Sequence, residues 1–314
     1  MASLESLVSL RQFRYFICVV EQRSFTSAAA ILHVAQPSLS RQVAQLEEIV
    51  GEQLLIRTPT GIIPTEPGFK VYYLARSLLE QVNGLVDEVR GTEREPQGRV
   101  SVALPATGGT DLISEVIKAC KSEIPQVSLH VQDGISTLTG QMLGSGLVDF
   151  GVVPNAEDIH GIASEPLFIE HLFIVRSKDG RQRQPSEIDF ASVTKFPLVM
   201  GPRSMHLRRY LEKAAADHGI ELQISYEQQT VGTIAGFVKA GLAATITNWP
   251  SLTEHFPVGT VWAQRIINPE LNRVISIAHP AERPLGQAAR AAYNIVRRLL
   301  LERVKDGRWR GKLC

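Results

Sequence analysis

The first fifty residues carry apolar side chains at the spacing of short helices. The segment 37–50 shows this best, because its apolar positions recur at steps of four, three and four residues and so form one stripe on an α-helix. These positions are Leu39, Val43, Leu46 and Val50. Pro37 suits the first turn, since its φ is already helical and its missing N–H would have no partner there. The other side of the predicted helix is polar, with Ser38, Ser40, Arg41 and Gln45.

Two more helices are predicted before this one. An apolar stripe within residues 13–20 marks the first, and Ser24 or Thr26 can cap the second, which is rich in small Ala residues. Only a few residues separate the second helix from Pro37, which is the arrangement of a helix-turn-helix. The polar side of the last helix then suits phosphates and base edges in a major groove. Taken alone, that helix fits equally an ordinary amphipathic helix with a solvated face.

A short hairpin is predicted after these helices. Gly51 is typical of a helix end, and the apolar pairs near residues 54–56 and 62–63 flank a polar tip. Such a hairpin beside a helix-turn-helix is a wing, whose Arg57 and Thr58 would contact phosphates. The alternative is an ordinary turn.

The segment 67–94 is predicted to be one long helix, capped by Thr65. Its apolar positions step by four, three, four, three and four residues, which is a heptad seam. They are Val71, Ala75, Leu78, Val82, Leu85 and Val89. We expect a second copy of the chain to cover this seam in a homodimer, whose paired helices would read an inverted repeat. The alternative is that the seam packs on the chain's own second domain.

From residue 98 the pattern changes to strands that alternate with helices, after the charged, turn-rich boundary 91–98. Apolar alternation begins at Val100, and the order β-α-β-α-β predicts a parallel sheet. The order continues into a second α/β subdomain, with strand crossings near 166–174 and 265–272. We therefore predict a DNA-binding domain, 1–66; a linker helix, 67–95; and a regulatory domain, 96–314. Within the last, one subdomain spans about 98–167 and 271–305, and the other about 168–270.

In such sheets ligands bind beyond the carboxyl ends of the strands, near helix N-termini. Four polar residues occupy predicted positions of this kind, namely Thr107, Ser136, Arg203 and Thr247. Hydroxyls, backbone N–H groups and one Arg would suit a small carboxylate or a similar anion. The alternative is that these residues only form turns and caps.

Composition adds limits to this picture. The chain has 314 residues, 44% of them hydrophobic and 21% charged, with a net charge of +1, which is ordinary for a globular protein of two or three domains. Residues 1–95 hold nine Lys or Arg and eleven Asp or Glu, a charge of −2, so DNA binding must come from one face rather than from a basic domain. We expect neither a membrane span nor a secretory signal, and a cytoplasmic location.

The candidate reactive residues favour no enzyme class. The chain lacks the Gly-x-Ser-x-Gly, His-Glu-x-x-His and P-loop patterns, so we predict no catalytic residue, no metal site and no cofactor. Its three cysteines, Cys18, Cys120 and Cys314, form no disulfide or metal pattern. Cys120 is expected in the core, with a redox thiol as the alternative.

The sequence SFTSAAAILHVAQPSLSRQVAQLEEIVGEQLLIRT, residues 24–58, followed by GIIPTEPG, residues 61–68, resembles the winged helix-turn-helix of LysR-type transcriptional regulators. The similarity runs without gaps from about residue 10 to residue 85. The motif LLIRT…G…PT is similar to that of the nitrogen-assimilation-control type of regulator. Pro67, where the family usually has Ala, is a departure that a first helical turn tolerates.

The resemblance implies a fold and a set of functional residues. The fold would be a winged helix-turn-helix and a long linker helix, then an α/β effector domain of two Rossmann-like subdomains resembling periplasmic binding proteins. The residues at the DNA would be Thr26, Ser27, Gln36, Pro37, Ser38, Ser40, Arg41, Arg57 and Thr58, to which the helix pattern adds Gln45. The Gly108-Gly109 pair departs from the more polar loop frequent in the family, so a ligand there would rely on backbone groups.

The implied function is a sequence-specific DNA-binding regulator. A small-molecule effector bound between the two α/β subdomains would modulate DNA binding or bending. Expected partners are double-stranded DNA with an inverted-repeat operator, a second copy in a homodimer, a homotetramer and RNA polymerase, without a membrane. The alternatives are a regulator that needs no ligand and, less favoured, an enzyme fused to a DNA-binding head.

Overall fold

The computed structural model describes residues 8–59, 61–90, 95–134, 136–178 and 184–314. The chain divides into two compact units, one reaching from the N-terminus to Glu95 with the short segment Ser145–Val148, the other holding the rest. Each unit is described by itself.

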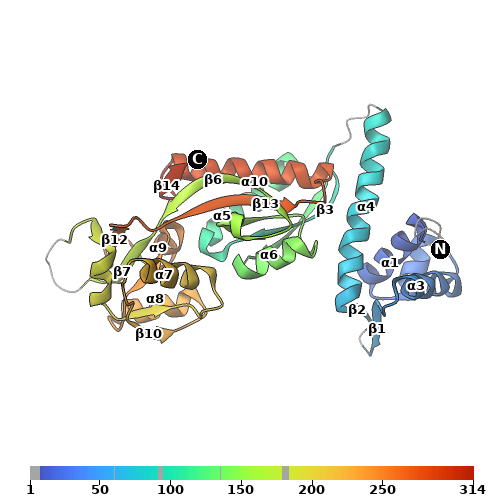
Figure 1. The fold of residues 1–314 in the computed structure, drawn as a ribbon. Helices are drawn as coiled ribbons and strands as arrows, with labels where there is room; N and C mark the ends of the chain where they lie inside the picture. The colour runs from blue at the N-terminus through green and yellow to red at the C-terminus, as the bar shows by residue number, and fades with distance from the viewer. Residues whose placement is uncertain (1–7, 60, 91–94, 135, 179–183) are drawn as a thin grey trace. The chain divides into compact units, whose positions relative to one another are not determined.

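The N-terminal unit consists of four helices and a two-stranded hairpin (Figure 1). The helices are α1 (Leu10–Gln22), α2 (Phe25–Leu32), α3 (Gln36–Val50) and α4 (Glu66–Arg90), and the strands are β1 (Leu55–Thr58) and β2 (Gly61–Pro64). Leu39, Val43 and Leu46 of α3 are fully or almost fully buried among side chains of α1 and α2, as the apolar stripe predicts, whereas Val50 at the end of the stripe is 39% exposed. Burial of this stripe holds the three helices together.

Local hydrogen bonds fix where these helices begin. Ser9 and Gln12 form a reciprocal capping box on α1, and the Ser24 hydroxyl accepts from the Ser27 N–H on α2. Helix α3 begins at Gln36, one residue earlier than predicted, so that Pro37 lies within the first turn. Gly51 ends it in the left-handed conformation.

Helix α4 begins where the chain turns tightly against the hairpin. The Thr65 hydroxyl accepts from the Gly68 N–H at 2.9 Å and donates to the Gln53 carbonyl at 2.6 Å. A Cβ on Gly68 would lie only 2.0 Å from the Leu54 carbonyl oxygen, so only glycine allows this approach. The contact gives a physical reason for the Thr-x-x-Gly spacing at this point of the sequence.

The first half of the C-terminal unit is a mixed sheet in the order β14-β6-β13-β5-β3-β4. Strands β3 (Gly98–Leu104), β4 (Val127–Asp133) and β5 (Phe150–Pro154) are parallel to one another, whereas β6 (Ile162–His171), β13 (Asn272–Pro280) and β14 (Gly311–Leu313) pair antiparallel. The predicted parallel sheet is therefore correct only for its first three strands. The antiparallel strands come from the chain's crossing to the second half and its return.

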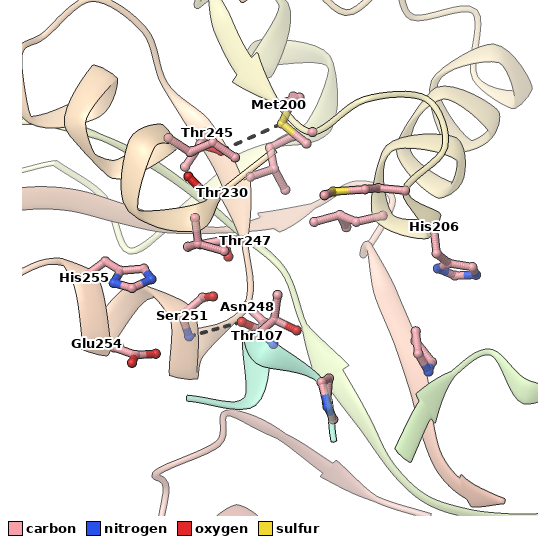
Figure 2. Close-up of a pocket in the computed structure, with 18 of the residues that line it drawn as sticks. Thr107, Met200, His206, Thr230, Thr245, Thr247, Asn248, Ser251, Glu254 and His255 are labelled. Carbon is pink, nitrogen blue, oxygen red and sulfur yellow. Dashed lines mark hydrogen bonds between the residues drawn. The ribbon is translucent and has the colours of Figure 1, made fainter. Parts of the chain in front are cut away.

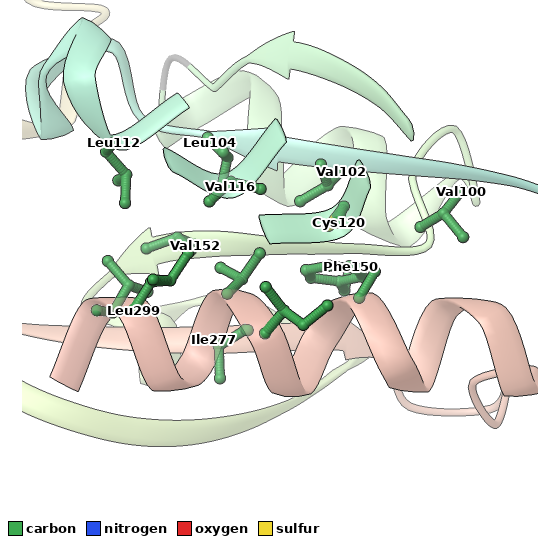
Figure 3. Close-up of a cluster of buried hydrophobic side chains, with 14 of the residues drawn as sticks. Val100, Val102, Leu104, Leu112, Val116, Cys120, Phe150, Val152, Ile277 and Leu299 are labelled. Atoms are coloured by element: carbon green, nitrogen blue, oxygen red, sulfur yellow. The ribbon is translucent and has the colours of Figure 1, made fainter. Parts of the chain in front are cut away.

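Helices cover both faces of this sheet. Val102 and Val152 face α5 (Thr110–Glu123) and α10 (Gln287–Lys305) in a buried cluster that Figure 3 shows. The alternate positions Ala103 and Gly151 face Thr139 of α6 (Ser136–Gly144) instead. Burial of both faces explains why these strands are almost continuously apolar.

The second half contains a four-stranded sheet in the order β11-β7-β12-β8 and the parallel pair β9–β10. Its strands are β7 (Phe173–Ser177), β8 (Glu187–Asp189), β9 (Leu198–Met200), β10 (Ile224–Glu227), β11 (Thr245–Thr247) and β12 (Val261–Ile267). Its α-helices are α7 (His206–Asp217), α8 (Val231–Lys239) and α9 (Trp249–His255). The pattern of apolar positions did not indicate α9 or the C-terminal strand β14.

Two crossings of the chain join the halves. The chain leaves the first half at the end of β6 and returns at the start of β13, and these two strands pair with each other from Asn272↔His171 onwards. Both crossings fall within the predicted segments. The pairing sets the two crossing points side by side.

Candidate DNA-binding surface and effector pocket

The residues predicted to contact DNA gather on α2, α3 and the hairpin of one unit. Eight of the ten are exposed, namely Thr26, Ser27, Gln36, Pro37, Ser38, Arg41, Gln45 and Arg57. Ser40 and Thr58 are half-buried. The surface on α3 lies opposite its buried stripe, so the polar side chains point away from the core of their unit.

Two of these residues also have structural roles. The Gln45 side-chain oxygen accepts from the amide of buried Gln12 at 3.2 Å, which ties α3 to the capped end of α1. The Thr58 hydroxyl donates to the Gly61 carbonyl at 2.8 Å and closes the hairpin. Substitution at either position would therefore disturb the unit as well as any DNA contact.

The charges of this surface favour phosphate. The guanidinium of Arg57 lies over the Phe25 ring at 5.6 Å, which positions the cation. The Glu47 carboxylate accepts from the N–H groups of Leu54 and Leu55 at 2.8 and 3.0 Å. Glu47 thus holds the start of the hairpin against α3.

The predicted heptad seam on α4 is only partly uncovered within its own unit. Ala75 is 2% exposed and Val71 packs on the N-terminal core, so Ala75 cannot contact a second copy and this part of the expectation is wrong. Leu78 and Val82 are 41% and 37% exposed, and Leu74, which the heptad count omitted, is 55% exposed. The side chains of Leu85 and Val89 lie outside the described residues. The exposed apolar face is therefore Leu74, Leu78 and Val82.

A cavity of about 480 Å³ lies between the two halves of the C-terminal unit. Figure 2 shows threonines from both halves around it: Thr107 follows β3, Thr230 precedes α8, and Thr245 and Thr247 belong to β11. Thr107 and Thr247 are two of the four predicted effector residues. The Ser136 side chain lies outside the described residues.

Arg203, the fourth predicted effector residue, does not line the cavity. Its side chain is 78% exposed and pairs with Glu212 at 3.2 Å. Arg208, in the first turn of the following helix, lines the cavity instead, and this residue is 6% exposed. It pairs with the same Glu212 at 2.9 Å and donates to the Gly201 carbonyl at 3.2 Å. Residue type and loop position could not separate these two arginines.

A buried ionic network forms the base of the cavity at the two strand crossings. Glu170 of β6 is fully buried and forms an ion pair with Arg273, its direct neighbour on β13. The Glu170 carboxylate also accepts from the Asn248 amide at 3.0 Å and from the Trp309 indole at 2.9 Å. One carboxylate thus connects both crossing strands, the start of α9 and the C-terminal segment. A charged residue inside each of two apolar strands was the only sequence signal for it.

Cys120 lies in the core, as predicted. Burial raises the pKa of Cys120 to about 11, and Cys120 is 2% exposed. Burial also raises the pKa of Cys18. Because the thiolate is the reactive form, neither thiol is suited to redox sensing. In the described ranges, no helix is both long and apolar enough to cross a membrane.

Both units match families of known proteins. Residues 10–69 match the family described as "Bacterial regulatory helix-turn-helix protein, lysR family", and residues 93–300 match "LysR substrate binding domain". The nitrogen assimilation regulatory protein nac of Klebsiella aerogenes is 29% identical over 290 residues, 92% of this chain and 94% of that protein.

Solved structures show the same fold. A full-length OxyR variant from Pseudomonas aeruginosa has a TM-score of 0.72 at 21% identity, over 92% of this chain and 95% of that one. Full-length CbnR, crystallised with its target DNA, has a TM-score of 0.53 at 23% identity, over 93% and 99% of the two chains.

A helix-turn-helix unit joined to a two-part substrate-binding unit is the organisation of a ligand-responsive transcriptional regulator. The chain belongs to the LysR family. It is a DNA-binding transcriptional regulator with an effector-binding domain rather than an enzyme, and the similarity to nac agrees with the subgroup resemblance.

Proposed function

We propose that α3 enters the major groove of an operator, with Arg41 and Ser38 at the bases and phosphates and Arg57 of the hairpin on the neighbouring backbone. The observation that carries this assignment is the exposed polar side of α3 opposite buried Leu39, Val43 and Leu46. In this assignment residues 1–66 bind DNA, 67–95 link the parts and 96–314 bind the effector.

A second copy of the chain covers Leu74, Leu78 and Val82 of α4 in this proposal. The three exposed residues are spaced four apart and so lie on one side of the helix, and exposed apolar faces of this kind mark interfaces. Two copies present two α3 helices, so the operator is an inverted repeat. A homotetramer and contact with RNA polymerase are further proposals that rest on the family resemblance.

The cavity between the halves is the proposed effector site. It has the size of known small-molecule sites, and its base is the network at the two crossing strands. A ligand that binds one angle between the halves more tightly shifts the population toward that angle. The change then alters DNA binding or bending.

The test of the DNA contact is an Arg41→Ala variant, measured by fluorescence anisotropy on a duplex that the unaltered protein selects from random sequence. Loss of an arginine contact to a base edge costs about 1–3 kcal/mol, so we expect affinity to fall about tenfold. The control is Lys118→Ala on α5, which removes an exposed cation from the other unit and should leave affinity unchanged. Equal affinity of the two variants would contradict a contact between Arg41 of α3 and the DNA.

A further inference from the structure

We propose that the effector is a neutral, largely apolar molecule with one or two hydrogen-bonding groups, rather than a small carboxylate. This inference rests on the proposed function of the cavity as the effector site. It follows from three properties of the described lining: its apolar walls, the internal pairing of its charges and its supply of neutral hydrogen-bonding groups.

The walls of the cavity are mostly apolar on both sides. The first half contributes Val152, Ile275 and Trp309, and the second contributes Met205, Val231 and Ile234. A cavity of about 480 Å³ with such walls removes most of a ligand's surface from water. An apolar ligand body gains from that transfer, whereas an ion loses its hydration.

The arginines of the lining are already neutralised inside the protein. Arg208 pairs with Glu212 at 2.9 Å, and Arg273 pairs with fully buried Glu170. A ligand carboxylate would have to compete with these carboxylates for the same guanidinium groups. Taking Arg273 from its partner would leave the buried carboxylate of Glu170 without a paired charge, which is costly.

A carboxylate of the protein also lies at one of the helix N-termini beside the cavity. Glu254 of α9 accepts from the Thr110 N–H at 3.2 Å, at the first residue of α5, and both residues line the cavity. Such an N-terminus would otherwise favour an anion. Here the negative charge of Glu254 repels a second carboxylate.

Neutral hydrogen-bonding groups remain for a ligand. Thr107 and Thr247 offer hydroxyls in the lining, and Ser251, 1% exposed, has a hydroxyl without a partner among the described residues.

Two isosteric probes separate the ligand classes. We expect 2-naphthamide, which is neutral, to bind at least tenfold more tightly than 2-naphthoate at pH 7.5, as measured by isothermal titration calorimetry on the full chain. Thr247→Val removes one hydroxyl at nearly constant volume and should weaken naphthamide binding about threefold to tenfold if the amide bonds to it.

Paired glycine variants on α8 show whether binding occurs in the cavity. A Cβ at Gly232 or at Gly236 meets nothing within 4 Å, so both positions have space for the first atom of a side chain. Of the two, only Gly232 lines the cavity. Gly232→Leu should therefore abolish binding, and Gly236→Leu should preserve it.

The possible results are distinct. Naphthoate binding as tightly as naphthamide, still blocked by Gly232→Leu, would overturn the neutral class and leave the cavity as the effector site. Binding that ignores Gly232→Leu, or no binding of either probe, would contradict the cavity itself and with it the proposed effector site.

Discussion

Replacing Arg273 with methionine is expected to lower the free energy of unfolding of the C-terminal unit by about 3–5 kcal/mol. The reason is that Glu170, which is fully buried, would lose its only charged partner in the described contacts. The hydrogen bonds from Asn248 and Trp309 remain, but they do not neutralise the carboxylate. Urea unfolding of the full chain, followed by tryptophan fluorescence, measures the loss.

The control for this variant removes both charges together. Glu170→Gln alone should destabilise by a similar amount, because it leaves the Arg273 cation buried and unpaired. The double variant Glu170→Gln, Arg273→Met has no charge at these two positions and keeps an amide oxygen for Asn248 and Trp309. Its loss should be much smaller than the sum of the single losses. Additive losses would show that the two groups do not act as a pair.

Replacing Leu78 and Val82 with glutamate is expected to separate the dimer. Burial of a leucine or valine contributes about 1.5–3 kcal/mol, and a symmetric interface contains each residue twice. The dissociation constant of the dimer should therefore rise by at least about a hundredfold. Sedimentation equilibrium measures it directly, and affinity for an inverted-repeat duplex should fall in parallel because one α3 then binds without the other.

A matched variant separates this effect from general loss of solubility. Ile117 on α5 is 46% exposed, close to the exposure of Leu78, and lies in the other unit. Ile117→Glu should leave the dimer and its DNA affinity intact. A dimer that survives the Leu78→Glu, Val82→Glu substitutions would show that another surface joins the copies.

The sequence predicted the N-terminal unit in detail because its information is local. The stripe of α3, the cap at Thr65 and the glycine at residue 68 each specify their own stretch of chain. What it did not predict was the covering of Ala75, since that depends on how α4 packs against α1. Periodicity shows that a residue shares a face with others, but not which partner covers that face.

In the C-terminal unit, the contacts of the candidate site could not be predicted from local sequence. The alternation of strands and helices along the chain predicted two α/β subdomains, yet the polar contacts depend on residues far apart in sequence. Glu170 meets Arg273 and Trp309 only after the chain has built the second half and returned. For the same reason, loop position favoured Arg203 over Arg208, although only the tertiary structure places one of them in the cavity wall.

These features suggest how binding in the cavity reaches the DNA. Asn248, Glu170 and Trp309 line the cavity and share one hydrogen-bonded carboxylate. A ligand that changes the angle between the halves must strain or reorganise this network, because its donors come from both halves. In the proposed mechanism, the effector selects between two arrangements of the crossing strands.

The most direct test of regulation by paired α3 helices is selection of duplexes from a random-sequence library by the full-length protein. We expect enrichment of one sequence in two inverted half-sites, with their centres about one helical turn, or a multiple of it, apart. Recovery of sequences no different from the starting library, or of a single half-site bound as tightly as the pair, would contradict paired reading of DNA by α3.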